Sequence, residues 1–301
     1  MPDVRFTKAH GAGNDFVIIA DPEGGLALDA TMARELCDRR TGIGGDGVLR
    51  VVPTAGIEGY EQDADVAPWF MDYRNADGSL GAMCGNGIRV FARYLVDAGY
   101  AQPGELAIAT RAGVYSVRVP REGDVTVDMG VPIINEETAR IRIAEAEEWL
   151  ESANVDMGNP HAVVVVGDVA QAGPLLKAPE YEPTSVYPDG VTIDFVAPLE
   201  ERRLRMRVYE RGVGETLSCG TGACAAVVTI ARRDRAPGDA RYVVETLGGD
   251  LAVAMRPEGR LELTGPALLV ASGTWRDQNW AARPCTLPEE PGGRAGSERR
   301  H

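Results

Sequence analysis

The sequence predicts a mixed α/β (α+β) fold made of two similar halves, and three observations support this. Short apolar or alternating runs, typical of strands, are separated by glycine-rich turns through most of the chain. Helical periodicity is confined to a few segments. A chain of 301 residues is also near the size at which one hydrophobic core stops growing, which favours two packed domains.

These patterns place the predicted elements along the chain. The strand-like runs of the first half are residues 4–7, 16–20, 47–52, 68–73, 106–110, 114–119 and 125–129. Those of the second half are residues 162–166, 191–195, 204–210, 240–246, 250–255 and 260–264. Helices are predicted over residues 31–38, 85–98, 145–153 and 220–233.

An internal repeat relates the two halves. A predicted strand ending near Asn75 is followed by a glycine-rich loop, the tetrapeptide Cys84-Gly-Asn-Gly and an apolar helix. About half a chain later, a strand ending near Glu210 is followed by a similar loop, Cys219-Gly-Thr-Gly and a second apolar helix. The repeat predicts two similarly folded lobes with a site between them.

The repeat also suggests where the chain divides. We expect residues 1–130 to form the lobe with Cys84 and residues 131–265 the lobe with Cys219. Residues 266–277 are expected to return to the first lobe. Residues 278–301 form a tail whose end is rich in proline, glycine and charge, and we expect this tail to be disordered.

Charge and hydropathy exclude several classes of protein. The net charge of −14 and the pI near 4.8 argue against nucleic-acid or anionic-lipid binding, which needs clustered lysine and arginine. No stretch approaches the roughly 20 apolar residues of a membrane span, and the N-terminus lacks the apolar core of a signal segment. We therefore expect a cytoplasmic protein that binds a small molecule.

The cysteine and lysine content predicts a site without metal or cofactor. The odd number of cysteines and the chain length indicate reduced thiols, and no spacing is that of a zinc site. Pyridoxal phosphate needs a Schiff-base lysine, and neither lysine of the chain has a suitable setting. The cysteines are Cys37, Cys84, Cys219, Cys224 and Cys285, and the lysines are Lys8 and Lys177.

The two repeated cysteines carry the predicted chemistry. A cysteine in the first turn of a helix meets free backbone N–H groups and the positive end of the helix dipole, which favour its thiolate. Flanking glycines let the same N–H groups hold a carboxylate. Inverting an α-carbon by proton transfer needs a base on one face and an acid on the other. Cys84 and Cys219 on facing loops would form that pair, so the sequence predicts a cofactor-independent amino-acid epimerase.

Six motifs, in order between about residue 6 and residue 273, resemble the diaminopimelate epimerase family. They are Asn14-Asp15-Phe16, Asn75-Ala76-Asp77-Gly78-Ser79, Met83-Cys84-Gly85-Asn86-Gly87, Gly158-Asn159-Pro160-His161, Glu210-Arg211-Gly212 and Ser218-Cys219-Gly220-Thr221-Gly222. The resemblance implies two pseudo-symmetric lobes, each a β-barrel-like sheet around a central helix. It also implies a homodimeric enzyme that interconverts LL- and meso-2,6-diaminopimelate in the synthesis of lysine and peptidoglycan precursors.

The resemblance further assigns roles to residues of this chain. It makes Cys84 and Cys219 the acid/base pair and His161 and Glu210 their neighbours in proton transfer. The substrate-binding residues that it implies are Asn14, Asn75, Asn159, Thr192 and Arg211 for the distal end of the substrate, and the amides of Gly85, Asn86, Gly220 and Thr221 for the reacting carboxylate. Which cysteine serves which face stays open.

Two positions depart from the family pattern. Family members often have glutamine at the position of Gly47 and asparagine at the position of Thr192, both toward the distal end of the substrate. Threonine keeps a hydroxyl group but lacks the paired donor and acceptor of an amide, and glycine offers only backbone. The two departures leave the recognition of the distal end open.

Structural interpretations compete with the functional ones. Free cysteine is usually a small core residue, and we expect that for the three cysteines outside the repeat. Without the resemblance, His161 would be a strand-edge histidine, Glu210-Arg211 a surface ion pair and Asn75 part of a turn. The repeated context ahead of Cys219 favours function for Glu210.

Two other functions remain as alternatives. Proline racemases and phenazine-biosynthesis isomerases resemble these epimerases, but only the racemases keep both cysteines. The polar groups of Asn75, Asn159 and Arg211 favour a substrate with a second amino-acid end, which proline lacks. A redox-sensing binding protein, in which Cys84 and Cys219 form a switchable disulfide, is the alternative from another class.

Overall fold

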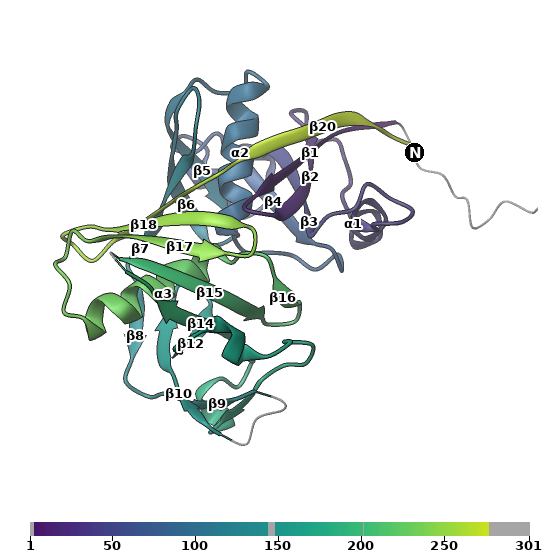
Figure 1. The fold of residues 1–301 in the computed structure, drawn as a ribbon. Coiled ribbons are helices and arrows are strands. Elements are labelled where there is room, and N and C mark those ends of the chain that lie inside the picture. Colours follow the sequence, from purple (N-terminus) through teal and green to yellow (C-terminus); the bar gives the residue numbers. More distant parts are fainter. Residues whose placement is uncertain (1–2, 144–147, 201, 277–301) are drawn as a thin grey trace, which may run out of the picture.

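The computed structural model describes residues 3–143, 148–200 and 202–276 and has two lobes (Figure 1). Seventeen strands form one hydrogen-bonded sheet that runs through both lobes, and a separate three-stranded sheet lies at the end of the second lobe. The predicted α+β class, with mostly strands and few helices in a two-lobed arrangement, is confirmed.

The first lobe contains helices α1 and α2 and the first strands of the chain together with the last one. Its elements are β1 (Val4–Gly11), β2 (Asn14–Ala20), α1 (Ala30–Cys37), β3 (Gly47–Pro53), β4 (Trp69–Asn75), α2 (Gly85–Asp97), β5 (Gly104–Thr110), β6 (Gly113–Val119), β7 (Val125–Gly130) and β20 (Leu268–Trp275), with short 3-10 turns at Thr54–Gly56 and Glu61–Asp63.

The second lobe contains α3 and the remaining strands. Its large sheet has β8 (Ile133–Asn135), β11 (Ala153–Asp156), β12 (Pro160–Val165), β14 (Thr192–Pro198), β15 (Arg203–Glu210), β16 (Gly214–Thr216), β17 (Arg241–Thr246), β18 (Gly249–Met255) and β19 (Leu261–Gly265), and α3 spans Gly220–Arg233. The small sheet has β9 (Arg140–Arg142), β10 (Leu150–Glu151) and β13 (Glu180–Glu182), and 3-10 turns lie at Val169–Ala172 and Thr184–Val186.

The strand pairings of the two lobes follow the same order. In the first lobe β1–β2 is antiparallel, β2–β3 parallel, β3–β4 antiparallel and β4–β5 parallel, and β5–β6–β7 complete an antiparallel meander. In the second lobe β11, β12, β14, β15, β17, β18 and β19 repeat this order. The internal repeat in the sequence therefore corresponds to a repeat in the fold.

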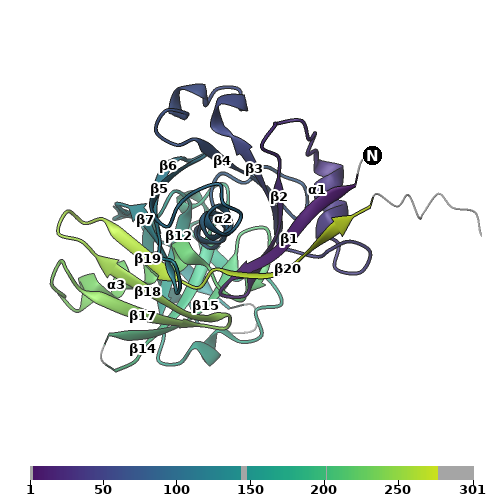
Figure 2. The ribbon, with the colours of Figure 1, turned by 90° about the horizontal axis from the view of Figure 1, so that it is seen from above.

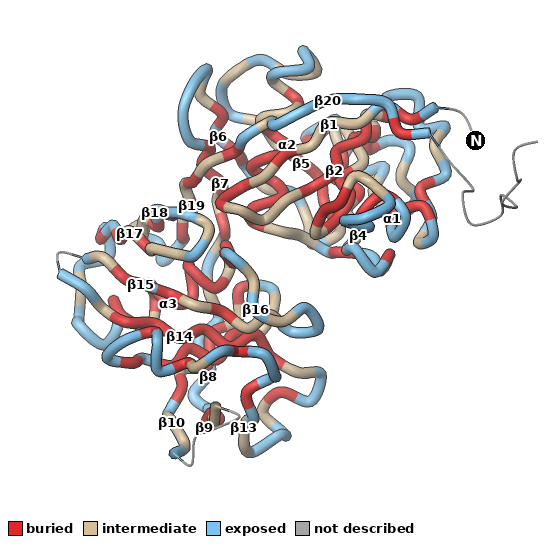
Figure 3. The backbone as a smooth tube through the Cα atoms, turned by 45° about the vertical axis from the view of Figure 1, so that its right-hand side comes forward, coloured by how far each residue is buried: buried red, intermediate tan, exposed pale blue. Residues whose placement is uncertain are grey.

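In each lobe a helix makes the crossover between two parallel strands. The chain passes from β4 to β5 through α2, and from β15 to β17 through β16 and α3. Figure 2 looks along α2 and shows strands on all sides of it. A helix surrounded by sheet must be apolar around its circumference. Accordingly Ile88, Val90 and Phe91, which face different sides of α2, are buried in one core with Ala225 and Val227, which lie on nearly opposite sides of α3. Most of both helices is coloured as buried in Figure 3.

Among the described strands one pairing joins the lobes. Strand β19 of the second lobe pairs antiparallel with β7 of the first, so the sheet is continuous across the junction. After β19 the chain crosses back, and β20 pairs antiparallel with β1. The ends of the described chain thus lie side by side (Figure 1).

The predicted helices over residues 31–38, 85–98 and 220–233 are confirmed as α1, α2 and α3. The helix predicted over residues 145–153 is wrong for residues 148–153, which contain β10 and the start of β11; residues 145–147 lie outside the described part of the chain. Pairing of Leu150 with Ile141 overrides the local helix preference. The tail expected at residues 278–301 also lies outside the described residues.

The packing of α2 predicts a large effect of one substitution. Phe91 is fully buried in the common core, so we expect Phe91→Ala to lower the free energy of unfolding by about 3–5 kcal/mol. Urea denaturation followed by circular dichroism measures this. Val114→Ala, on an exposed position of β6, is the control and should change the free energy by less than about 1 kcal/mol. A loss below that value for Phe91→Ala would contradict the assignment of α2 as the centre of the lobe.

Candidate active site

Cys84 and Cys219 occupy matching positions as N-caps of α2 and α3. The Cys84 Sγ accepts a hydrogen bond from the Gly87 N–H at 3.4 Å, and the Cys219 Sγ accepts one from the Gly222 N–H at 3.4 Å. Both cysteines have extended backbone, as N-cap residues do. Each thiol thus lies at the positive end of its helix.

The N-termini of the two helices meet. A Cβ atom added at Gly85 would lie 3.5 Å from the Gly220 Cα, and one added at Gly220 would lie 3.4 Å from the Gly85 Cα. At these distances an added Cβ atom would be in van der Waals contact with the opposite backbone, and the Leu263 side chain lies still closer to both positions. The first-turn amides of both helices, which have no partner within a helix, therefore gather in one place beside the two cysteines.

Asn14 connects the first cysteine to an acidic neighbour. The Cys84 thiol lies 3.5 Å from the Asn14 Oδ1, and the Asn86 Nδ2 lies 3.4 Å from the same oxygen. The Asn14 Nδ2 donates to the Asp46 Oδ2 at 2.7 Å. Asn14 is therefore held beside Cys84 with its amide orientation fixed.

Thr221 contacts the second cysteine, and Asp194, which is paired with His161, lies against the first turn of its helix. The Thr221 Oγ1 lies 3.3 Å from the Cys219 Sγ. His161 and Asp194 are both fully buried, and the His161 Nδ1 lies 2.7 Å from the Asp194 Oδ2. The other ring nitrogen, Nε2, has no hydrogen-bond partner within the described residues. The carboxylate thus fixes the ring and leaves Nε2 free to exchange a proton.

Glu210 completes the acidic side of the site. It lies at the end of β15 and accepts a hydrogen bond from the Thr216 hydroxyl. Burial raises its pKa above the ordinary value, and the charge of Asp194 raises it further. The sequence places Glu210 in the repeat at the position that Asn75 has in the first lobe, because both end the strand before the cysteine loop.

Burial reverses the expected tuning of the thiols. Burial raises the pKa of Cys84 to about 11, although the Gly87 amide acts to lower it. Burial also raises the pKa of Cys219 well above its usual range, and the charges of Glu210 and Asp194 add to this. The helix terminus favours the thiolate as expected, but desolvation outweighs this effect, so the pKa of each thiol is raised.

The departure at Gly47 has a structural reason. A Cβ atom at Gly47 would lie 2.6 Å from the Tyr73 Cε2, and one at Gly81 would lie 2.1 Å from the Tyr73 Cδ1. The Tyr73 ring therefore fills the space beside Gly47, and its hydroxyl donates to the Asn75 Oδ1 at 2.6 Å. The Asn75 Nδ2 donates to the Ser79 hydroxyl, which leaves this amide one further donor and acceptor.

The other predicted binding residues are held less directly. Asn159 precedes β12 in the loop before His161 and is partly buried. The Thr192 Oγ1 accepts from the Arg211 N–H at 3.3 Å, opposite His161 in the β12–β14 register. The Arg211 guanidinium donates to the Asp189 carbonyl and is exposed, so in this structure it does not contact either cysteine loop.

Sequence reasoning missed Asp194 and Tyr73. The signal for Asp194 was an acidic residue in the centre of an otherwise apolar strand, residues 191–197. The signal for Tyr73 was its place two residues before Asn75 on the same face of β4. Each shares a strand face with a predicted site residue, Asp194 with Thr192 and Tyr73 with Asn75.

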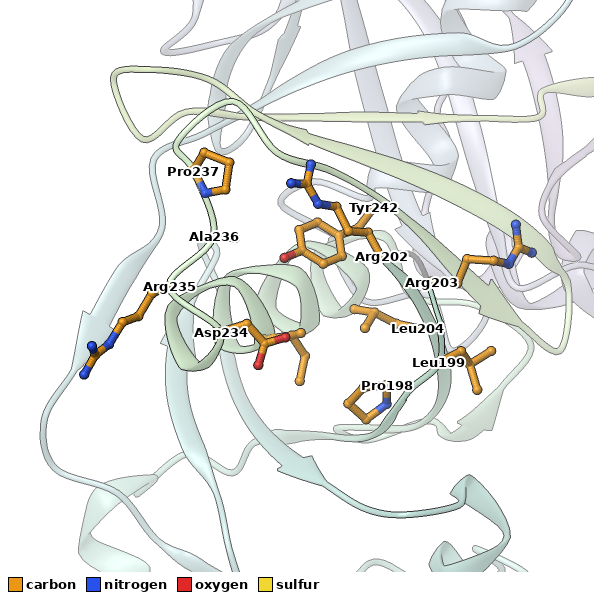
Figure 4. Close-up of a pocket in the computed structure, with 11 residues that line it drawn as sticks. Pro198, Leu199, Arg202, Arg203, Leu204, Asp234, Arg235, Ala236, Pro237 and Tyr242 are labelled. Atoms are coloured by element: carbon orange, nitrogen blue, oxygen red, sulfur yellow. The ribbon is translucent and has the colours of Figure 1, made fainter.

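A cavity of about 290 Å³ lies at the far end of α3 and is separate from this site. Ile230, Asp234 and Tyr242 line it, and Figure 4 shows Arg235 pointing away from the other side chains. The 14-residue helix α3 is about 20 Å long and Cys219 caps its other end, so the cavity is about that far from the Cys219 thiol.

Within the described residues no cluster of three His, Cys, Asp or Glu side chains could hold a metal ion, and no helix is long and apolar enough to cross a membrane.

The fold is that of a class of two-lobed proteins of known structure. The solved structure of a hydroxyproline epimerase from Agrobacterium vitis aligns with a TM-score of 0.63 at 17% identity, covering 90% of this chain and 92% of that one.

Sequence comparison defines the family. The family model described as diaminopimelate epimerase matches residues 6–134 and 153–270, and the chain belongs to that family. A diaminopimelate epimerase of Streptomyces coelicolor is 50% identical over 282 residues, covering 92% of this chain and 96% of that protein. One of Thermobifida fusca is 44% identical over 284 residues, covering 91% and 98%.

The contact between α3 and Asp194 predicts the effect of a methyl group. A Cβ atom at Gly222 would lie 2.3 Å from the Asp194 Oδ1, so Gly222→Ala must displace the carboxylate that holds His161. We expect kcat to fall at least about tenfold and the free energy of unfolding to fall by about 1–3 kcal/mol. Gly238→Ala is the matched control, because nothing lies within 4 Å of its added Cβ. Unchanged kcat in Gly222→Ala would reject the role given to this contact.

Proposed function

We propose that this protein interconverts LL- and meso-diaminopimelate by a cofactor-independent reaction between two thiols, in lysine and peptidoglycan-precursor synthesis. The single observation that carries the proposal is the meeting of two helix N-termini, each capped by a cysteine. Membership of the diaminopimelate epimerase family and relatives of that name supply the substrate.

The two cysteines act from opposite faces of the α-carbon. One, as a thiolate, takes the α-proton, so the C–H bond breaks and an S–H bond forms. The other, as a thiol, gives its proton to the opposite face, so its S–H bond breaks and a new C–H bond forms. The reverse reaction exchanges the roles of Cys84 and Cys219, and no electron transfer is involved.

The helix N-termini hold the reacting carboxylate. The amides of Gly85, Asn86, Gly220 and Thr221 supply donors where negative charge develops in the transition state. Because these donors belong to the backbone, they are oriented before the substrate arrives. Cys219 is buried and Cys84 is half-buried, which limits the access of water to both thiols.

His161 and Glu210 adjust the protonation of Cys219. Support comes from the buried His161–Asp194 pair and from the burial of Glu210. The His161 Nε2 has no partner within the described residues and can accept or donate a proton.

The distal end of the substrate is bound by five side chains, those of Asn14, Asn75, Asn159, Thr192 and Arg211. Arg211 must turn from the Asp189 carbonyl to do so.

The lobes divide at residues 130 and 131, and residues 266–277 return to the first lobe. Support comes from the strand order, because β7 ends at Gly130 and β20 pairs with β1.

The protein is a cytoplasmic homodimer. Exposed Leu268 and Val270 on β20 supply apolar area for a second copy, and the described cysteines are all free thiols.

Removal of either thiol tests the two-thiol mechanism. We expect Cys84→Ala and Cys219→Ala each to lower kcat for epimerisation of LL-diaminopimelate by at least about 10³-fold, because each variant lacks one of the two proton carriers. Cys37→Ala is the control and should retain activity, because Cys37 is the last residue of α1 and packs in a separate core cluster. Full turnover in either cysteine variant would reject the mechanism. Racemisation of proline, with diaminopimelate left unchanged, would reject the substrate.

The buried thiols also predict a pH dependence. A base with a pKa raised to about 11 is protonated at neutral pH, and its reactive fraction grows with pH below that value. We therefore expect kcat/KM to rise by at least about tenfold between pH 7 and pH 9. The assay should be run at constant ionic strength, with unfolding monitored in parallel. A plateau already reached at pH 7 would mean that the free enzyme holds a preformed thiolate.

A further inference from the structure

Arg89 is a fully buried cation in the first turns of α2. Its Nη1 donates to the Gly85 carbonyl at 3.0 Å and its Nη2 to the Asn86 Oδ1 at 2.8 Å, while its Nε has no partner. No carboxylate of the described residues forms an ion pair with it. An unpaired buried charge is unfavourable, and the positive end of the helix adds to the unfavourable term.

The protein nevertheless provides a close-fitting space for the guanidinium. A Cβ atom added at Gly11 would lie 3.4 Å from the Arg89 Nη2, and one added at Gly265 would lie 3.1 Å from it. Gly11 ends β1 in the first lobe and Gly265 ends β19 in the second. Arg89 therefore lies where the two lobes meet, between backbones that leave room for it.

Through Asn86, Arg89 is connected to the loop of the other cysteine. The Asn86 Nδ2 donates to the Ser218 carbonyl and hydroxyl, each at 3.0 Å. Because Arg89 donates to the Oδ1 of the same amide, it fixes the orientation in which Asn86 can reach Ser218. Ser218 precedes Cys219, so one hydrogen-bond chain joins the two cysteine loops.

Two charged groups act on the Cys84 thiol, and three more lie beside its neighbour Asn14. Arg89 of α2 lowers the pKa of the thiol, whereas Glu210 of β15 acts in the opposite direction. Lys8 of β1 is paired with Asp15 of β2, and Asp46 lies in the loop before β3 and holds Asn14. Burial lowers the pKa of Arg89 itself to about 10, so the guanidinium keeps its charge at neutral pH.

We propose that Arg89 is a positioning residue whose buried charge stabilises the Cys84 thiolate and the bound substrate carboxylate, and whose hydrogen bonds hold Asn86 across the two cysteine loops. This inference rests on the proposed role of Cys84 as a base. It explains why an arginine without a carboxylate partner is buried beside a site that accumulates negative charge during the reaction.

The test is the pH profile of Cys84 alkylation by iodoacetamide in the full-length protein, read by mass spectrometry of the Cys84 peptide. We expect Arg89→Met to shift the midpoint of the profile upward by at least about one pH unit, equal to about tenfold less thiolate at a given pH. Arg89→Lys, which keeps the charge, should stay within about half a unit of the unmodified protein. Arg93→Met is the control, because Arg93 lies one turn later and donates to the Pro120 and Gly123 carbonyls.

A folded Arg89→Met variant with an unchanged midpoint would overturn the proposal. If Arg89→Met does not fold, Arg89→Lys decides: a shift as large as one unit would overturn the charge role, and wild-type kcat would overturn the positioning role. Alkylation needs no diaminopimelate. Failure of the inference therefore remains distinct from failure of the proposed reaction.

Discussion

The contact between Gly85 and Gly220 is the constraint on which the site depends. At this point two helices meet end to end, and each brings a capping cysteine and a set of free amides. A Cβ atom at either glycine would already be in van der Waals contact with the Cα of the other and close to the Leu263 side chain. The repeated fold holds the two helix ends together. Each helix lies inside its own set of strands, and the β7–β19 pairing fixes one set of strands against the other.

The short distance between the two helix ends also places several negatively charged groups near one another, which is electrostatically unfavourable. In the proposed reaction a thiolate and a substrate carboxylate add negative charge beside Glu210 and Asp194, and burial raises the pKa of both thiols. Two helix N-termini and the Arg89 guanidinium supply the opposing charge. Because the raised pKa favours the neutral thiol in the free protein, the proposed mechanism requires the thiol to lose its proton when the substrate binds. The thiolate would then form only when the substrate is present.

Much of the architecture could be predicted because it follows from local patterns. Alternating runs and the Cys-Gly-x-Gly repeat predicted α2, α3 and most long strands, whereas the segment at Leu150 failed because its pairing partner, Ile141, determines its conformation. The pairing of His161 with Asp194 could not be predicted, since it depends on the register of β12 and β14. Thiol burial likewise depends on how the lobes close, which no local pattern encodes. Predicted roles for the distal binding residues stay predictions.

The central claim is that two distinct groups carry the proton on the two faces of the α-carbon. The most direct measurement is the position of deuterium in the first few per cent of reaction with LL-diaminopimelate in deuterated water. A thiol holds one abstracted proton without exchange while the opposite thiol delivers a solvent-derived one. The account therefore predicts deuterium at one α-carbon of the meso product and almost none in recovered substrate. Equal deuterium in product and recovered substrate would show a single exchanging base and would contradict the account.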